Sequence, residues 1–598
     1  MKHINYPIVA RGYSPMYRMH SYDTRKPGNV IREYIETYCP ENGIVLDPFS
    51  GSGVTIIEAV SSGRRAIGFE INPLAVLITK STLMHVNLNK LSVEAERLKE
   101  RLKKKRVKVC NKEYELFDLY KTRCERCGCE ATILWIVYSF VMKCPQCAKE
   151  ITIWNCKKCR GQGVRECYEC GNKFSLNNAA FLRYKWILTG YKCRNCGELI
   201  KKPDNSDIKL ESCIENIQLP ENVPKYRLYY DDNTPFLTKR RGEYVHELFD
   251  KRALLSLSFL LSEIENVKDK TVRELFKLCF SAILEFVCRL NPLKHKKGGY
   301  ETTPGLAVKE LWIPSVHCIN NPFVMFFKRL ERIKRGKEES MSRIRHVTIT
   351  NNFRAFTKSN ANVLLIEDTS LHIEDRLCGE CCGEKREECE GCVDFILTDP
   401  PYGEAVQTYE LDFFRNAWLF PEKLEFWRDE IVINKRQRKD INWYFNNIRE
   451  VFRQMYRVLK PGHFAVLTFH SSFIEVYNTV IRAARDVGFV LDKIIYQPPS
   501  MRSVKQSLHP HTSAVGDYYI RFVKTERPTS VSETKEYDEK VFERVVLRLI
   551  EQIIAERGEP TSFTDILKEI YPRLEKEGYL LYAKPERIQE ILKKYGET

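Results

Sequence analysis

An acid, two prolines and a tyrosine directly follow an apolar run in "VDFILTDPPYG", residues 393–403. The run predicts a buried strand, which places Asp399 and Tyr402 at its carboxyl end. Proline fixes φ and has no N–H group to donate, so Pro400 and Pro401 can hold neighbouring acceptors rigidly. A D-P or P-P pair alone is common in turns that only redirect the chain. The segment therefore predicts a chemical site only in combination with other motifs.

A glycine turn, "DPFSGSG" at residues 47–53, lies between another predicted strand and a helix. Small residues let a ligand approach the backbone, and the helix N-terminus offers free N–H groups. The Lys-Ser/Thr pair of a phosphate-binding P-loop is missing. Glu70 ends the next strand in "GFEINP", where a carboxylate can accept both hydroxyls of a ribose. Either feature alone has a plain structural explanation, but together they predict a nucleoside-bearing cofactor.

Helices and strands alternate on both sides of a long interruption, and this alternation must position the two motifs. Residues 29–80 predict helix, strand, helix and strand, and the pattern resumes at "ANVLLIEDTS", residues 361–370, and runs to about residue 525. Joined across the interruption, these elements predict one doubly wound α/β sheet with its ligand site at the carboxyl ends of the strands. A polar linker then precedes a small tail, either winged-helix-like or purely helical.

The combination of "DPFSGSG", "GFEINP" and "TDPPYG", with "RKPGNVIREYI" ahead of it, resembles the DNA amino-methyltransferases. These enzymes transfer a methyl group from S-adenosylmethionine to an exocyclic base nitrogen. The resemblance covers roughly residues 18–80 and 360–525 and implies a Rossmann-like methyltransferase sheet, interrupted here by a large insertion. The insertion enters after the second strand, which departs from the usual place of the family's target-recognition domain.

The resemblance also implies roles for individual residues. Asp399 and the carbonyl of Pro400 would accept the two amino hydrogens, Pro401 would keep the turn rigid, and Tyr402 would stack on a base turned out of the helix. No metal is needed for the transfer. For Asp368 a helix N-cap is the alternative role. The residues expected to bind the cofactor are Lys26, Pro27, Asp47, Phe49, Gly51, Ser52, Gly53, Glu70, Asn72 and Asp368.

Three functions follow from these motifs. An acid at the first position of the tetrapeptide is more often associated in the family with adenine N6, and serine with cytosine N4, so we expect an adenine-N6 DNA methyltransferase with a cytosine-N4 enzyme as the alternative. RNA guanine-N2 methyltransferases use similar elements, although no RNA-binding domain precedes the core here. A catalytically inactive zinc-ribbon protein that binds nucleic acid is the third candidate.

The chain has 22 cysteines, many of them in C-x-x-C pairs, a pattern that predicts zinc rather than disulfides. The first two pairs flank a strand-rich stretch, so we expect them to form a zinc ribbon around a β-hairpin. "CKKCRGQG" resembles the zinc repeats of chaperone cysteine-rich domains, which favours pairing the third pair with the fourth. One of five pairs is left over. The pairs are Cys124/Cys127, Cys144/Cys147, Cys156/Cys159, Cys167/Cys170 and Cys193/Cys196.

A second cysteine cluster precedes the strand that leads to Asp399, and it is expected to staple a long loop. Its predicted ligands are Cys378, Cys381, Cys389 and Cys392. With the first block, this gives two or three structural zinc ions that shape a DNA-contacting surface.

Composition indicates the partners and the compartment. The 598 residues carry a formal charge of +17, which fits duplex DNA, and basic clusters lie at residues 101–108, 238–243, 294–297 and 435–439. A solvated surface is the alternative for any one cluster. No apolar run is long enough for a membrane span and the N-terminus lacks a secretion signal, so we expect a cytoplasmic protein. A restriction or defence-system protein is a candidate partner.

The expected domains follow the same order along the chain. They are a first core part at 1–84, a charged helical linker at 85–119, a zinc-ribbon block at 120–205, a helical insertion and candidate target-recognition region at 206–355, a second core part at 356–525, and a linker with a helical tail at 526–598.

Overall fold

The computed structural model describes most of the chain. The described residues are 3–22, 24–161, 163–236, 242–296, 299–302, 311–382, 391–469, 474–498, 517–525, 538–558, 561, 563–579, 583 and 585–595.

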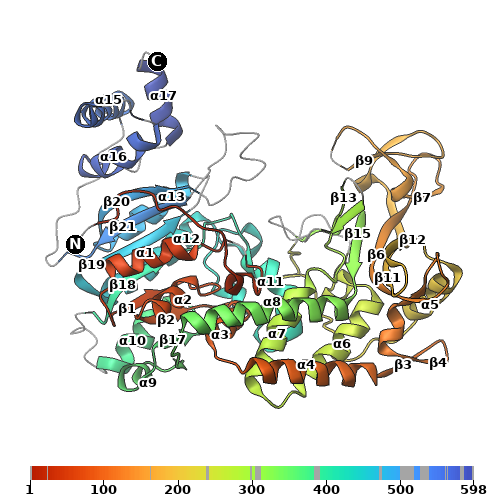
Figure 1. Ribbon diagram of the computed structural model, residues 1–598. Helices are drawn as coiled ribbons and strands as arrows, with labels where there is room; N and C mark the ends of the chain where they lie inside the picture. Colours follow the sequence, from red (N-terminus) through yellow and green to blue (C-terminus); the bar gives the residue numbers. More distant parts are fainter. Residues whose placement is uncertain are drawn as a thin grey trace.

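A large mixed sheet forms the centre of the core, as predicted for an α/β protein (Figure 1). Its order is β16-β17-β2-β1-β18-β19-β21-β20. All pairs from β16 to β19 are parallel, and β21 is antiparallel to both neighbours. The strands are β1 Ile44–Asp47, β2 Arg65–Phe69, β16 Ile349–Thr350, β17 Val363–Ile366, β18 Val393–Thr398, β19 Leu459–Phe469, β20 Val490–Gln497 and β21 Asp517–Val523.

Helices cover both faces of this sheet because its strands are apolar on both sides. Val45 points into a core formed with α1 (Gly28–Tyr38) and α2 (Val54–Ser61). Its neighbour Leu46 points into the opposite core, since successive side chains of a strand alternate. The helices of that second face are α9 Phe353–Lys358, α10 Ile373–Cys382, α12 Ile441–Val458 and α13 Ile474–Asp486.

The insertion leaves the sheet through α3 (Pro73–Leu83) and returns through α8 (Pro322–Arg343). Two long antiparallel strands, β6 (Glu130–Lys143) and β11 (Ala180–Cys193), form the centre of its sheet. Figure 1 shows them projecting away from the core. The remaining elements are α4 Leu88–Lys103, β3 Arg106–Val109, β4 Lys112–Glu115, β5 Lys121–Arg123, β7 Glu150–Thr152, β8 Lys157–Lys158, β9 Val164–Glu166, β10 Lys173–Ser175, β12 Gly197–Lys201, α5 Asn205–Glu215, α6 Lys251–Glu265, α7 Lys270–Leu284, β13 Leu293–Lys296, β14 Gly299–Thr302 and β15 Val316–Asn320.

The predicted β-hairpin between the first two cysteine pairs is wrong. Residues 130–143 contain no Gly, Pro, Asn or Asp that would start a turn, and they form the single strand β6. One edge of β6 pairs with β11 and the other with β15. The two halves of the stretch do not pair with each other, as a hairpin would require. As a result the first two cysteine pairs lie at opposite ends of one strand.

The helices of the insertion share one hydrophobic core with helices that flank the large sheet. This core combines α4, α6, α7 and α8 with α3 and with α11 (Thr408–Leu419), which follows the tetrapeptide. An ion pair between Arg415 of α11 and Glu285, which follows α7, joins the two parts at 2.7 Å. The insertion is therefore packed against α3 and α11 of the core through a shared hydrophobic core and this ion pair.

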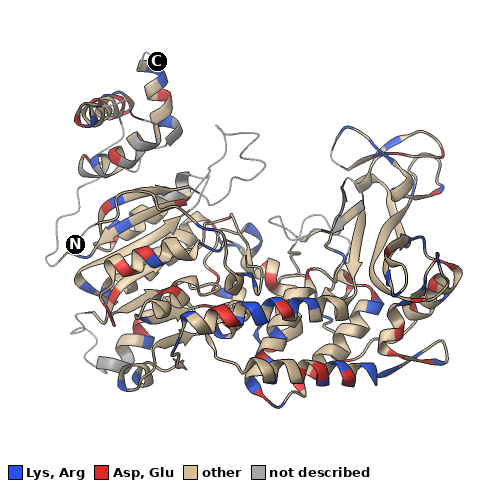
Figure 2. Ribbon diagram, viewed as in Figure 1, with Lys and Arg blue, Asp and Glu red and all other residues tan. Residues whose placement is uncertain are grey.

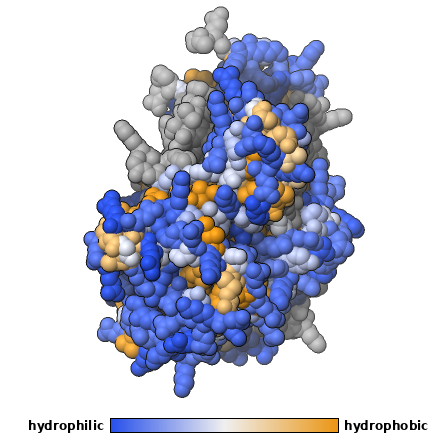
Figure 3. Space-filling model, turned by 90° about the vertical axis from the view of Figure 1, so that its right-hand side faces the viewer, coloured by the Kyte–Doolittle hydropathy of each residue, from blue (hydrophilic) through white to orange (hydrophobic). Residues whose placement is uncertain are grey.

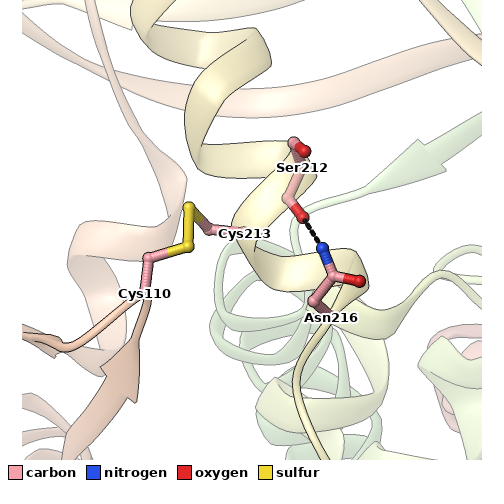
Figure 4. The surroundings of a disulfide bond; sticks show 4 residues. All are labelled: Cys110, Ser212, Cys213 and Asn216. Atoms are coloured by element: carbon pink, nitrogen blue, oxygen red, sulfur yellow. Dashed lines mark hydrogen bonds between the residues drawn. A yellow bond between two sulfur atoms is a disulfide. The ribbon is translucent and has the colours of Figure 1, made fainter.

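A disulfide that the cysteine spacing did not predict joins the start of the insertion to its middle (Figure 4). Cys110 lies in the turn between β3 and β4, and Cys213 lies in α5, 103 residues further along the chain. Neither residue belongs to a C-x-x-C pair, which is why spacing alone could not single them out. The bond closes the chain segment that contains β6 and β11.

Three helices form the described part of the C-terminal region: α15 Glu539–Arg557, α16 Phe563–Lys576 and α17 Pro585–Tyr595. α16 packs on β20, where Lys493 and Glu569 form an ion pair at 2.9 Å. In the described parts of the chain, every helix is too short or too polar to cross a membrane.

Candidate active site and cysteine clusters

A cavity lies at the carboxyl ends of β1, β2 and β18, where both sequence motifs meet. The structure brings together eleven of the residues expected to act on or bind ligands. These are Lys26, Asp47, Phe49, Gly51, Ser52, Glu70, Asn72, Asp399, Pro400, Pro401 and Tyr402.

The glycine turn approaches the cavity with its backbone. Gly51 has φ +48°, a left-handed conformation that glycine adopts without strain, and its N–H donates to the Glu70 carboxylate at 2.7 Å. A side chain at Gly51 would also come within 3.2 Å of the Tyr22 ring. Gly53, with φ +78°, packs against Thr79 and does not line the cavity.

Glu70 is held by two backbone N–H groups, one for each carboxylate oxygen. The second comes from Asn72 at 2.8 Å, and burial raises the pKa of Glu70 to about 7. Asn72 also caps α3 through Leu74 and donates to Asp412 of α11 at 2.8 Å. The acid that could accept ribose hydroxyls is thus fixed by the turn, by α3 and indirectly by α11.

Asp47 joins the two central strands at the floor of the cavity. Its carboxylate accepts from the Thr398 hydroxyl at 2.6 Å and from the Phe49 N–H at 3.1 Å. Burial raises the pKa of Asp47 to about 6, against the effect of these hydrogen bonds. The bond ties the last residue of β1 to the last residue of β18, directly before Asp399.

Asp399 lies under three donors that all reach the same oxygen, Oδ1. Thr468 of β19 donates at 2.6 Å, the Tyr402 hydroxyl donates as well, and the Lys26 ammonium lies 3.4 Å away. Burial raises the pKa of Asp399, and Lys26 counteracts this shift most strongly. The Pro401 carbonyl accepts from Tyr444 at 2.5 Å, which holds the turn itself in place.

Several residues of the site were missed by sequence reasoning. Arg25 lines the cavity and donates from Nε to the Ser52 hydroxyl at 3.0 Å, so it lies next to the glycine turn. Thr468 and Asp517 lie near Asp399 and Lys26. Arg25 stands beside the expected Lys26 in "RKPGN", but nothing in the local sequence indicates that Asp517 reaches the same site.

Besides Gly53, two more of the expected cofactor residues lie outside the cavity lining. Asp368 lines a different surface depression and is bound by the Arg376 guanidinium at 2.8 Å and by His372 at 3.0 Å, whereas its neighbours Thr369 and Ser370 line the cavity. The Asp368 carboxylate is engaged by this ion pair outside the cavity lining, and its expected adenine contact stays a prediction. Pro27 is the N-cap of α1 and lies outside the lining.

Eight cysteines form two compact groups of four Sγ atoms, each group within 4.8 Å. The Sγ–Sγ distances of Cys127–Cys193, Cys144–Cys170 and Cys147–Cys167 are 3.5, 3.8 and 4.0 Å. A zinc ion with four bonds of 2.3 Å to sulfur requires about 3.8 Å between ligands. Both groups could hold structural zinc. The groups are Cys124, Cys127, Cys193 and Cys196, and Cys144, Cys147, Cys167 and Cys170.

Two predicted groupings of the C-x-x-C pairs are wrong: the first pair with the second, and the third pair with the fourth. β6 separates Cys127 from Cys144, and a 14-residue strand extends roughly 46 Å, so these pairs cannot share an ion. The β6–β11 pairing brings Cys193 back beside Cys127 instead. Cys156 and Cys159 are the pair left over, and the Cys156 thiol contacts the Thr152 carbonyl.

The second cysteine cluster lies largely outside the described residues. Cys378 is buried in α10 and Cys392 is partly buried before β18, but Cys389 and the side chain of Cys381 are not described. The prediction of a third zinc site there stays a prediction.

Comparison with known proteins finds similarity in two separate segments of the chain. The model of the family described as DNA methylase matches residues 7–81 and 393–581. The protein YubD from Escherichia coli is 50% identical over 48 residues, 8% of this chain and 21% of that protein. The Type II methyltransferases M.MvaI of Kocuria varians and M.HindIII of Haemophilus influenzae are 32% and 34% identical over 79 and 70 residues, 13% and 12% of this chain. The matches span only about a fifth of these relatives' lengths: 21%, 17% and 20%.

Proposed function

We propose, from a core whose two segments belong to the DNA methylase family, that the protein transfers a methyl group from S-adenosylmethionine to the exocyclic N6 of adenine in duplex DNA. The observation that carries the proposal is the shared cavity of two fixed acids. Glu70 stands at the cofactor end, beside the glycine turn, and Asp399 stands at the end of β18. Glu70, as a hydrogen-bond acceptor for the nucleoside, and Asp399, as an acceptor for the amine, therefore line the same cavity.

The chemistry requires an acceptor such as Asp399. The lone pair of an exocyclic amine is delocalised into the base ring, so the nitrogen is a poor nucleophile until acceptors bind its hydrogens. S-adenosylmethionine supplies the activated methyl group. Asp399 and the Pro400 carbonyl would orient the amine towards it. The C–N bond would form as the C–S bond breaks, S-adenosylhomocysteine would leave, and the nitrogen would then lose one proton to solvent water. Positioning of this kind can supply a large part of a rate enhancement.

Adenine is the proposed base because an acid, Asp399, occupies the first position of the tetrapeptide. Cytosine N4 carries the same two hydrogens, so the product analysis must distinguish N4-methylcytosine from N6-methyladenine.

Duplex DNA is the proposed partner because of the charge of the cysteine module, which we define as residues 121–201. This module has 15 Lys and Arg against 6 Asp and Glu. Lys and Arg mark the loops at both ends of the module (Figure 2). Figure 3 shows this end of the molecule as mainly hydrophilic, with several separate apolar patches. Ten exposed basic side chains have no ion pair among the described residues: Arg123, Arg126, Lys143, Lys157, Lys158, Arg160, Lys173, Lys185, Lys192 and Arg194. Unpaired cations of this kind suit phosphate contacts.

The basic clusters expected from the sequence are less suited to DNA. In residues 101–108, Arg101 and Lys105 are paired with Glu263. In residues 435–439, Arg436 is paired with Glu410, and Lys439 is buried and donates to two backbone carbonyls. Most of residues 238–243, and the side chains of 294–297, lie outside the described part of the chain.

The test is incubation of the protein with labelled S-adenosylmethionine and, separately, duplex DNA, RNA and protein acceptors, followed by digestion and identification of the methylated nucleoside. We expect N6-methyladenine from DNA. Label in RNA alone, or in no acceptor at all, would refute DNA methylation, and N4-methylcytosine would correct the base.

Asp399→Ala should abolish transfer while the cofactor still binds, since Asp399 acts on the amine. Asp394→Asn is the matched control, because Asp394 lies at the opposite end of β18 and pairs with Lys460 at 2.6 Å. Its transfer rate should remain close to that of the wild type. Transfer by Asp399→Ala at the wild-type rate would remove Asp399 from the reaction.

Gly51→Val should weaken cofactor binding. A valine would meet the Tyr22 ring and would have to adopt φ +48° in the turn. The expected loss of affinity is about 10-fold to 100-fold, from roughly 1–3 kcal/mol of strain. Isothermal titration calorimetry with S-adenosylhomocysteine measures it directly, and unchanged affinity would contradict the assignment of the turn.

A further inference from the structure

We propose that Lys26 and Asp517 are positioning residues for Asp399: Lys26 holds one carboxylate oxygen, Asp517 anchors Lys26, and the other oxygen is presented to the target amine. This inference rests on the proposed function, because it assigns to Asp399 the task of accepting an amino hydrogen. It gives Lys26 a different role from the cofactor contact expected from the sequence.

The contacts of Lys26 carry the argument. Its Nζ lies 3.0 Å from Asp517 Oδ2, 3.4 Å from Asp399 Oδ1 and 5.2 Å from the centre of the Tyr402 ring. The side chain is only 9% exposed. A lysine with so little access to water needs compensation for its lost hydration, and two carboxylates supply it here. The pair is therefore unlike an exposed salt bridge of small effect.

The arrangement distinguishes the two oxygens of Asp399. Lys26, Tyr402 and Thr468 all approach Oδ1. Within the described residues, Oδ2 accepts no hydrogen bond. A carboxylate fixed by three donors on one oxygen cannot rotate freely, so its second oxygen keeps lone pairs in a constant direction. An amino group bound in the cavity would find an acceptor already oriented.

Asp517 explains how Lys26 is kept in this place. It is the first residue of β21, which pairs with β19 next to Thr468. Lys26 comes from the segment before α1. Three segments distant in sequence thus meet at Asp399, and the sheet register determines their alignment.

The surrounding charges predict opposite effects for the two partners. Besides Lys26 and Asp517, the titratable groups that face Asp399 within the described part of the chain are Asp47, Tyr402 and Tyr519. Lys26 favours the ionised form of Asp399, and the carboxylate of Asp517 disfavours it by repulsion. A cation or an anion at such distances shifts the pKa of a carboxyl group by about 1–3 units.

The test is the pH dependence of kcat/KM for the wild type, Lys26→Met, Lys26→Arg and Asp517→Asn, because its acid limb reports the ionisation of an essential group in the free enzyme. For Lys26→Met we expect the acid limb to move up by about 1–2 pH units. Lys26→Arg, which keeps the cation, should restore most of the wild-type profile. For Asp517→Asn we expect a shift in the opposite direction, to lower pH.

A purely structural role of Lys26 would lower activity equally at all pH values, and that result would overturn the proposal. An acid limb of Asp517→Asn that stays at the wild-type pH or moves to higher pH would also overturn it. This second variant keeps the test decisive even where Lys26→Met does not fold. Affinity for S-adenosylhomocysteine, measured by calorimetry, should stay within about twofold in each variant. A large loss in Lys26→Met would instead favour the cofactor contact. Absence of transfer by the wild type is a separate outcome and refutes the proposed function itself.

Discussion

Reduction of the Cys110–Cys213 disulfide should loosen the cysteine module by an amount that depends on zinc. The bond closes a segment of 103 residues, and a cross-link over such a loop removes about 4.7 kcal/mol of entropy from the open state. The cluster of Cys124, Cys127, Cys193 and Cys196 lies inside this segment. With that cluster closed by zinc, only about 31 residues remain in the loop, and the same relation gives about 3.7 kcal/mol.

Hydrogen exchange of the β6 and β11 amides measures this free energy of opening directly. Reduction by a phosphine that does not bind zinc should speed exchange about 500-fold with the metal in place and about 3,000-fold after chelation, from the 3.7 and 4.7 kcal/mol above. The double variant Cys110→Ser, Cys213→Ser is the control, because the reductant should then change nothing. Equal exchange in the oxidised and reduced protein would refute the reasoning, and equal effects with and without metal would refute the zinc cross-link.

Two further predictions concern Glu70 and a buried lysine. Burial raises the pKa of Glu70 to about 7. The proposed contact with the ribose hydroxyls uses its ionised form, so cofactor affinity should fall nearly tenfold per pH unit below about 7. Glu70→Gln should weaken binding and remove this dependence, both measured by calorimetry. Lys337, fully buried in α8, donates to the carbonyls of Ser81, Thr82 and Met84 at 2.5–3.0 Å. Lys337→Met should lower the free energy of unfolding by roughly 3 kcal/mol, whereas an unchanged melting temperature would contradict the role.

Local sequence was sufficient to locate the strands that carry the site. Strands buried on both faces are continuous apolar runs, so the runs ending at Asp47, Glu70 and Asp399 could be recognised one by one. Parallel strands place their carboxyl ends at one edge, and this brought the three acids together in the expected sheet. The fold class and the approach of the two motifs were predictable for that reason.

Long-range partners were not predictable in the same way. Lys26 meets Asp517 across almost the whole chain, and only the completed β19–β21 pairing places them side by side. The C-x-x-C pairs are chemically equivalent, so the sequence does not show which of them share a site. This depends on the length of β6 and on its antiparallel pairing with β11. The ion pair of Asp368 with Arg376, eight residues further along the chain, was likewise not predicted from the sequence.

The place of the insertion sets the order in which the protein can fold during synthesis. β1 obtains its central partner only when β18 has been made, since Val45 and Leu46 pair with Phe395 and Ile396. At 5–20 residues per second, the ribosome needs roughly 20–70 s for the intervening chain. β6 and β11 meet much sooner, and α3 can pack on α7 and α8 before β18 exists. We therefore expect the insertion to fold, and α3 to pack on it, before the central sheet is complete.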